Sequence, residues 1–430
     1  MSGASTPSPL CSDRGPFLKR NYAWAVLGIG AFAQASFAAV AQGLPAIGPA
    51  LRQGFDLTLP QVGFVLGALT FGGAVTLVPW GVAADRFGER RVLFAGLVGC
   101  AGALALASSV DGALPVGLFL FGAGTLGSIA SVGSGRAVMG WFASSQRGFA
   151  LGLRQTAVPL GGALAAVSLP AVAARSGVDA ALLALASACA LGAVLSALWL
   201  RNPPRREETE TTVPTRPMRD RRIWRIAAGS SLLIFCQISV VSYVVLFLHG
   251  QKSMSATAAG AVLAVMQIVG AAGRVLAGRW SDRLQDRVAP LRVLALGMTA
   301  SWIVVPVVLD LSNWIVLAAL VAAGSVSISW NGLSFTAAAE LAGADRSGTA
   351  IGMQQTVLFA MAALVAPTFG ALVEWLSWRA AFALLAVPAL AAWFVLKPLD
   401  KKIASLGRPI ASGGDRKGVA SVSPSRSSSR

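Results

Sequence analysis

Three arginines stand inside long apolar segments of this 430-residue chain, where a charge is costly. Arg136, Arg154 and Arg274 each lie in a run of mostly apolar residues, and no Asp or Glu falls near the middle of such a run. A charged side chain inside a bilayer has to face a cavity or a partner. Because a guanidinium group is a planar fork of donors that matches a carboxylate or a phosphate, this pattern predicts an anion-binding site.

Each arginine also has a structural alternative. Arg154 and Arg274 could make hydrogen bonds or an ion pair that only hold helices together. Arg136 lies near the end of its segment, so it could extend its charge to the lipid headgroups instead of contacting a substrate. We treat all three as candidate substrate ligands.

Neutral polar residues at similar depth could add hydrogen bonds to a substrate. The candidates are Gln34, Gln155, Gln237, Asn331 and Gln355. Hydrogen bonds between facing helices are the alternative role for each of them.

Twelve segments are long and apolar enough to be transmembrane helices, each of which needs about 20 mostly apolar residues. Hydrophobic residues make up 55% of the chain, charged residues 12%, and the mean hydropathy is +0.68. A soluble domain carries about 25% charged residues, so a soluble enzyme and a disordered or fibrous protein are excluded. The expected spans are 22–46, 61–83, 92–110, 113–137, 148–172, 179–200, 223–248, 257–279, 291–309, 314–338, 348–372 and 380–396.

The distribution of basic residues predicts the orientation of these spans. With a cytoplasmic N-terminus, the cytoplasmic segments hold 28 of the 35 Lys and Arg residues, the outer loops hold four, and three lie within spans. This is the positive-inside pattern. It explains most of the net charge of +17 as topology and argues against a nucleic-acid partner. We expect a multi-pass protein of the bacterial inner membrane with both termini cytoplasmic.

One long charged stretch divides the chain into two halves. We expect a cytoplasmic tail over 1–21, a six-helix bundle over 22–200, a cytoplasmic linker over 201–222 and a second six-helix bundle over 223–396. The remaining segment, 397–430, ends in a Ser-, Gly- and Arg-rich sequence that predicts a disordered tail.

The two halves resemble each other in sequence. The pattern that opens the fifth span recurs 200 residues later, so that Gly148, Ala150, Gly152, Gln155 and Thr156 match Gly348, Ala350, Gly352, Gln355 and Thr356. Arg154 then aligns with Gln354, so its charge is not part of the shared scaffold. Because six is even, both halves have the same orientation, as in transporters with a substrate site near the membrane midplane.

A second repeated pattern follows the second span of each half. Its first copy is Gly81-Val-Ala-Ala-Asp85-Arg86-Phe-Gly88-Glu-Arg90-Arg91, and a degenerate copy runs from Gly278 to Arg287. The first copy resembles the signature of the major facilitator superfamily, and the resemblance covers about residues 20–400. It implies an all-α membrane protein of 12 transmembrane helices in two six-helix bundles, related by a parallel pseudo-twofold repeat, that rock about a central cavity.

The resemblance also implies a conformational latch at the cytoplasmic ends of the helices. Asp85 would face the positive N-terminus of the eleventh helix in the outward-open state, and Asp282 would do the same against the fifth helix. The alternative is that these charges serve only topology and solubility. The latch residues expected from the two copies are Gly81, Asp85, Arg86 and Arg90, and Gly278, Asp282 and Arg283.

By resemblance, the function is secondary active transport by alternating access. An arginine placed like Arg274 binds carboxylate in monocarboxylate carriers of the family, although a Gly-Arg pair is also common in its other members. Gln34, Gln237 and Asn331 lie on helices 1, 7 and 10, which line the cavity in the family. We therefore expect a carrier of a small organic anion, monomeric as is usual in the family.

Two other functions stay open, a multidrug or metabolite exporter of the same fold and a non-transporting membrane sensor. In the family's drug exporters an arginine often precedes a glycine motif like Gly122-Ala-Gly124-Thr-Leu-Gly127, and Leu118 is near its place, which disfavours the exporter. The motif itself lies in an apolar span and indicates helix packing rather than nucleotide binding.

A proton relay within the membrane usually needs an Asp, Glu or His inside a span, and the expected spans contain none near their middle. His249 falls at the outer end of its span. A substrate that carries the proton, exchange of two substrates and facilitated diffusion are equally compatible with the sequence.

No metal site, cofactor or enzymatic centre is expected. Cys11, Cys100, Cys189 and Cys236 are scattered, and His249 is the only histidine. The chain contains no His-Glu-x-x-His, Gly-x-Ser-x-Gly or P-loop motif, so membrane-embedded proteolysis and nucleotide hydrolysis are disfavoured.

Overall fold

The computed structural model describes residues 16–142, 150, 153–201, 219–342 and 347–399, and all regular structure in these ranges is helical. The first half consists of α1 (Pro16–Gly43), η1 (Leu44–Ile47), α2 (Gly48–Gly54), α3 (Leu59–Phe87), α4 (Glu89–Ala107), α5 (Ala113–Gly127), α6 (Ile129–Trp141) and α8 (Ala157–Trp199). The second half consists of α9 (Arg221–Lys252), α10 (Ala256–Leu284), α11 (Val288–Val308), α12 (Asn313–Ile328), α13 (Asn331–Ala342), α14 (Ser347–Trp375), α15 (Trp378–Leu384), α16 (Ala386–Leu396) and η4 (Lys397–Leu399).

Within the described residues, 11 helical stretches are long and apolar enough to cross a membrane. The stretch Leu153–Trp199 has 47 residues, which would measure about 70 Å as one straight helix, more than twice the bilayer core of about 30 Å. It turns back at Gly177, whose φ of 85° and ψ of 171° leave the helical region and suit a residue without a side chain. The stretch therefore makes two passes, which confirms twelve spans.

Helix boundaries differ from the expected spans where the chain bends. The expected fourth span is divided at Ser128 between α5 and α6, and the tenth is divided after Ile328 between α12 and α13. Helix α1 begins at Pro16, inside the segment expected to be a tail, and α9 begins at Arg221, inside the expected linker. Hydropathy misses these ends because amphipathic helix termini can extend beyond the lipid.

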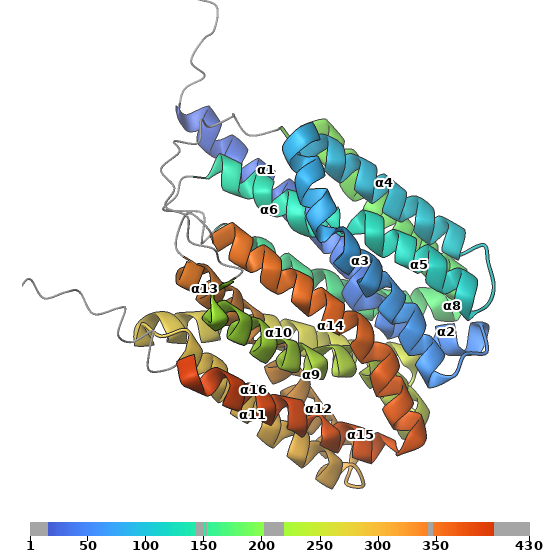
Figure 1. Cartoon of the computed structure of the whole chain (residues 1–430). Coiled ribbons are helices and arrows are strands. Elements are labelled where there is room, and N and C mark those ends of the chain that lie inside the picture. The colour runs from blue at the N-terminus through green and yellow to red at the C-terminus, as the bar shows by residue number, and fades with distance from the viewer. Residues whose placement is uncertain (1–15, 143–149, 151–152, 202–218, 343–346, 400–430) are drawn as a thin grey trace, which may run out of the picture.

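The helices form two bundles that lie side by side (Figure 1). In the first, α1 and α4 pack on α8, and α3 packs on α5; in the second, α9 packs on α14 and α16, and α10 packs on α12. Most contact between the bundles comes from two pairs of long helices, α3 with α14 and α8 with α10, and the short η1 and α2 add contacts with α9. We call the end where α1 begins and α16 finishes the tail end, and the opposite end, which carries α2, the far end (Figure 1).

The pair α3 and α14 touches toward the far end and parts toward the tail end. A Cβ added to Gly63 would lie 2.5 Å from the Ala366 carbonyl oxygen, and one added to Gly67 would lie 2.6 Å from that of Ala363. Gly81 is 14 residues beyond Gly67, nearly four turns, and so lies on the same face of α3. A Cβ at Gly81 meets nothing within 4 Å, so this face has left α14 by that point.

The pair α8 and α10 diverges in the same direction. A Cβ at Gly260 would lie 2.3 Å from the carbonyl oxygen of Ala166, whereas one at Gly278, five turns further along the same face of α10, meets nothing within 4 Å. The bundles are therefore closed against each other at the far end and separate toward the tail end.

Candidate functional site

Arg154 is buried in the first bundle, with 6% of its surface exposed. Its Nη1 atom donates to Ser134 Oγ at 2.7 Å and to Gln34 Oε1 and the Ser131 carbonyl oxygen, each at 3.1 Å. Its Nη2 atom donates to Gln155 Oε1 at 3.2 Å. The structure thus brings two of the predicted polar residues, Gln34 and Gln155, onto Arg154.

The contacts of Arg154 leave two of its five N–H donors without a hydrogen-bond partner, although Nε is buried. Atom Nε has no hydrogen-bond partner, and Nη2 uses one of its two hydrogens. These two nitrogens lie on the same edge of the group, so together they form the side-on fork that binds two oxygens of one oxyanion.

Gln354 takes the place of Arg154 in the second bundle. It is fully buried, and its Nε2 atom donates to Ser334 Oγ and, at 3.1 Å, to Ser230 Oγ. Ser334 follows Ser134 by 200 residues, as Gln354 follows Arg154. The two bundles therefore hold equivalent hydrogen bonds, charged in the first and neutral in the second.

Arg274 lies half-buried on α10 in the second bundle. Its Nε atom donates to the Ile328 carbonyl oxygen at 2.8 Å, and Nη2 donates to Asn331 Oδ1 at 2.6 Å. Three of the five N–H donors of Arg274 are therefore left, two on Nη1 and one on Nη2, and together these nitrogens form the end-on fork. The predicted residues Arg274 and Asn331 thus lie in contact.

The two arginines have only neutral partners. Within the described residues, no carboxylate forms an ion pair with Arg154 or Arg274. No described carboxylate therefore balances their charges. The alternative role of an ion pair that only holds helices together has no support among the described residues.

Arg154, three residues before α8 in the helical stretch Leu153–Trp199, and Arg274 on α10 lie at one level along the pair of α8 and α10. Gly162 on α8 and Gln267 on α10 are in contact, since a Cβ at Gly162 would lie 2.9 Å from Gln267 Nε2. Arg154 is eight residues before Gly162, and Arg274 is seven residues after Gln267. Because the two helices run in opposite directions, both arginines lie about 11 Å from this contact toward the tail end.

A neutral polar pair lies on the far side of that level. Gln267, which is 2% exposed, donates from Nε2 to Gln42 Oε1 on α1 at 3.3 Å, so this bond connects the two bundles. Gln267 and Arg274 are seven residues apart and share a face of α10. Gln267 was not among the predicted site residues, although the spacing of seven from Arg274 could have indicated it.

The remaining predicted ligands do not reach the arginines. Gln237 is buried, and its Oε1 atom has no partner, while Gln355 is half-buried; neither is hydrogen-bonded to Arg154 or Arg274. Arg136 lies in α6, and its side chain is outside the described part of the chain.

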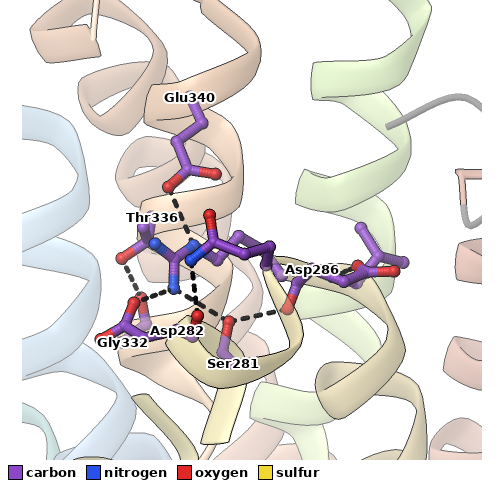
Figure 2. Close-up of polar contacts among 9 residues, drawn as sticks. Ser281, Asp282, Asp286, Gly332, Thr336 and Glu340 are labelled. Carbon is purple, nitrogen blue, oxygen red and sulfur yellow. Dashed lines mark hydrogen bonds and ion pairs between the residues drawn. The ribbon is translucent and has the colours of Figure 1, made fainter. Parts of the chain in front are cut away.

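The second copy of the signature forms a charged network within its own bundle. Arg287 donates from Nη1 to Asp282 and, at 3.0 Å, to Ser281 Oγ, and from Nε to Glu340 Oε1 at 2.8 Å. Figure 2 shows Ser281 and Asp282 at the end of α10 facing Glu340 of α13. Asp282 thus pairs inside the second bundle, and the start of the fifth helix near Gly148 lies outside the described residues.

The first copy lies at the tail end of α3. A Cβ added to Gly81, or to Gly278 in the second copy, would meet nothing within 4 Å there. Arg86 is exposed and lies over the Phe87 ring at 5.4 Å, and Arg90 and Arg283 are also exposed. The side chain of Asp85 is outside the described part of the chain.

At the far end, one carboxylate joins the bundles. Glu374, at the end of α14, accepts a hydrogen bond from the Leu59 backbone nitrogen at 2.9 Å, at the N-terminus of α3. A carboxylate there is favoured by the helix dipole as well as by the bond. Tyr243 of α9 lies beside it, with its hydroxyl 2.9 Å from the Leu59 carbonyl oxygen and 2.8 Å from that of Ala366.

Comparison with known proteins gives a consistent family. The model described as Major Facilitator Superfamily matches residues 27–367. An uncharacterised MFS-type transporter of Mycobacterium tuberculosis is 35% identical over 372 residues, which cover 86% of this chain and 83% of that protein. A probable sulfoacetate transporter of Cupriavidus necator is 26% identical over 401 residues, covering 81% of this chain and 87% of the relative.

A solved structure has the same fold. The crystal structure of a bacterial homolog of the human lysosomal transporter Spinster, in an inward-facing and unoccupied conformation, superposes with a TM-score of 0.71 at 15% identity. The match covers 91% of this chain and 96% of that one.

Proposed function

The chain belongs to the major facilitator superfamily and is a multi-pass membrane transporter rather than an enzyme, and we propose that its cargo is a small organic anion. The observation that carries this proposal is that Arg154 and Arg274, one on each bundle at the same level, have only neutral partners among the described residues. An anion bound between them balances charge that the described residues leave unbalanced.

The chemistry of the site supports an anion over a cation. Both guanidinium groups keep free donors in fork geometry, and arginine does not lose its charge in a protein. The relative from Cupriavidus necator is named a probable sulfoacetate transporter, which is consistent with an anionic cargo.

Transport proceeds by alternating access of the two bundles. The positive-inside pattern of the loops supports a cytoplasmic tail end, and with this orientation the structure corresponds to the inward-open state. When α3 and α14 close at the tail end, Asp85 faces the N-terminus of α14, and Asp282 exchanges its bond with Arg287 for the start of the fifth helix. The far-end bond between Glu374 and Leu59 breaks in the same step.

Thermal stability of the purified full-length protein tests the cargo. The ligands are monocarboxylates, dicarboxylates, sulfonates, phosphorylated compounds and lipophilic cations, at constant ionic strength and at two pH values. A ligand present at about 100 times its dissociation constant stabilises by about 2.7 kcal/mol, which a melting curve detects. We expect at least one anion class to raise the melting temperature, and Arg154→Gln and Arg274→Gln to remove that shift.

Arg175→Gln is the matched control, because Arg175 is an exposed arginine near the turn at Gly177. It should leave the shift unchanged. Uptake into proteoliposomes of the anion that binds establishes transport and separates a carrier from a sensor. Shifts with lipophilic cations alone, unchanged in both arginine variants, would instead identify an exporter.

A further inference from the structure

The charges of the site indicate how many negative charges the substrate carries. Arg154 and Arg274 place two positive charges at one level, and no described side chain balances either of them. In a medium of low dielectric constant, a monoanion would leave one of these charges without a counter-charge. A dianion balances both.

The hydrogen-bond donors that the two arginines have left indicate a substrate with two oxyanion groups, which equals the number of negative charges. Arg154 offers the side-on edge of Nε and Nη2, because its Nη1 end is occupied by Gln34, Ser131 and Ser134. Arg274 offers the end-on fork of Nη1 and Nη2, because its side-on edge is occupied by Ile328 and Asn331. Each fork fits one carboxylate or sulfonate group with two hydrogen bonds.

Among the described residues, the side chains that meet in a hydrogen bond between the bundles on the far side of this level are the neutral Gln42 and Gln267. The opposite side faces the tail end, where α8 and α10 part.

We propose that the substrate is a small dianion with an oxyanion group at each end, a dicarboxylate or a sulfonate-carboxylate, held by Arg154 through one group and by Arg274 through the other. This inference rests on the proposed function and specifies its substrate class. Because the two forks belong to different bundles, a dianion draws the tail-end halves of α8 and α10 together. A monoanion engages one bundle and leaves the two arginines repelling each other.

The test compares each dianion with its own half ester, which has the same length and one charge less. The probes are malonate, succinate, glutarate and adipate with their monomethyl esters, and sulfoacetate with its methyl ester, each titrated against the full-length protein by thermal shift at neutral pH and constant ionic strength. We expect at least one dianion to reach its half-maximal shift at a concentration about tenfold or more below that of its half ester.

Single substitutions assign the two ends of the ligand. In Arg274→Gln the dianion and its half ester should bind equally, within about twofold, and the same holds for Arg154→Gln. Arg274→Lys keeps the charge and loses the fork, so it should retain part of the preference even if one glutamine variant does not fold. Arg175→Gln should preserve the full preference.

The outcomes separate this inference from the proposed function. Equal binding of dianions and half esters, still lost in both arginine variants, overturns the dianion and leaves an anion carrier. A response to monocarboxylates or phosphorylated compounds without any response to these dianions also overturns the dianion and leaves an anion carrier. A response to lipophilic cations alone overturns both.

Discussion

Arg154 and Gln354 occupy equivalent places in the two bundles, each donating to a serine 20 residues before it, Ser134 or Ser334. The fold thus holds the same hydrogen bond twice, and only one copy carries a charge. This asymmetry makes matched substitutions possible, because a change that affects helix packing in both bundles affects anion binding in only one.

The first prediction uses the two serines. Ser134→Ala removes the shortest bond to Arg154 and loosens its orientation, so we expect the anion concentration for half-maximal thermal shift to rise about tenfold. Ser334→Ala removes the neutral counterpart and should leave that concentration within about twofold. A loss of anion binding in Ser334→Ala equal to that in Ser134→Ala would contradict the assignment of Arg154 to the site.

The second prediction concerns Asn331, whose Oδ1 atom is 2.6 Å from Arg274 Nη2. Asn331→Asp has nearly the same shape and supplies a carboxylate that balances Arg274 internally. We expect it to weaken anion binding more than Asn331→Leu, which only releases the guanidinium group, because a fixed carboxylate competes with the substrate. Titrations of the two variants by thermal shift check the order; the reverse order would show that Arg274 does not meet the anion.

The third prediction uses two glycines on one face of α3. Gly67→Val would collide with the Ala363 carbonyl oxygen and prevent closure of the far end, whereas Gly81→Val meets open space in this state and should block closure of the tail end instead. Both should lose at least about 90% of transport, since uptake needs both closures.

Labelling separates these two variants. Gln267→Cys, buried at the interface between the bundles, reports opening of the far end in a Cys11→Ser background, since the other three cysteines are buried. A membrane-impermeant reagent should label it faster in Gly67→Val and more slowly in Gly81→Val. Equal labelling in the two variants would mean that α3 and α14 do not alternate as proposed.

The fourth prediction concerns the far-end contact of Glu374 with the Leu59 backbone nitrogen. Glu374→Gln keeps the hydrogen bond and loses the charge at the N-terminus of α3, and Glu374→Ala loses both. Since a charge there contributes about 0.3–1 kcal/mol, we expect a modest increase in far-end labelling for Glu374→Gln and a larger one for Glu374→Ala. If neither variant changes the labelling rate of Gln267→Cys, Glu374 does not help to hold the far end closed.

The fifth prediction is a pH effect at the start of α9. Asp220 caps this helix by accepting from the Arg222 backbone nitrogen at 2.8 Å, and its bond with the Arg222 side chain lowers the pKa of the Asp220 carboxyl. A depressed pKa in the folded state contributes stability above the unfolded value of about 3.9, and this contribution is lost as pH falls through the folded pKa.

Substitution isolates that effect. Asp220→Ala should lower stability by about 1 kcal/mol at neutral pH, and the difference from the parent protein should shrink below about pH 4. Melting curves of the two proteins across that range measure it. A constant difference at all pH values would show that the carboxylate charge has no part in the cap.

The spans, and the presence of Arg154 and Arg274 inside them, could be predicted from the sequence because both follow from local composition, whereas the role of the two arginines stays a proposal. A charge within a long apolar segment is visible without any tertiary information, so Arg154 and Arg274 could be singled out. Ser131, Ser134 and Gln267 could not, since serine and glutamine are compatible with many helix positions and only packing decides which of them meets an arginine.

Conformation could not be predicted from the sequence either. The signature motif describes contacts of one state, whereas a Cβ added to Gly81 or Gly278 would meet nothing within 4 Å in this one. The far-end contact of Glu374 joins residues more than 300 positions apart. Its partner is a backbone nitrogen, and since almost every residue has one, the sequence does not indicate which one makes this contact. Hydropathy did predict a reversal between the spans 148–172 and 179–200, and the structure assigns it to Gly177.

The crossing of α3 and α14 near one end has a consequence for the ion gradients of the cell. Both helices have 29 residues, and each contains one proline, Pro79 in α3 and Pro367 in α14. Because the two helices touch toward one end and part toward the other, we expect that bringing the separated ends together moves the touching ends apart. A water-filled path open on both sides would require the pair to part along its whole length. We therefore expect leakage of protons and salt to be opposed as long as this pair and the pair of α8 and α10 each stay closed toward one end.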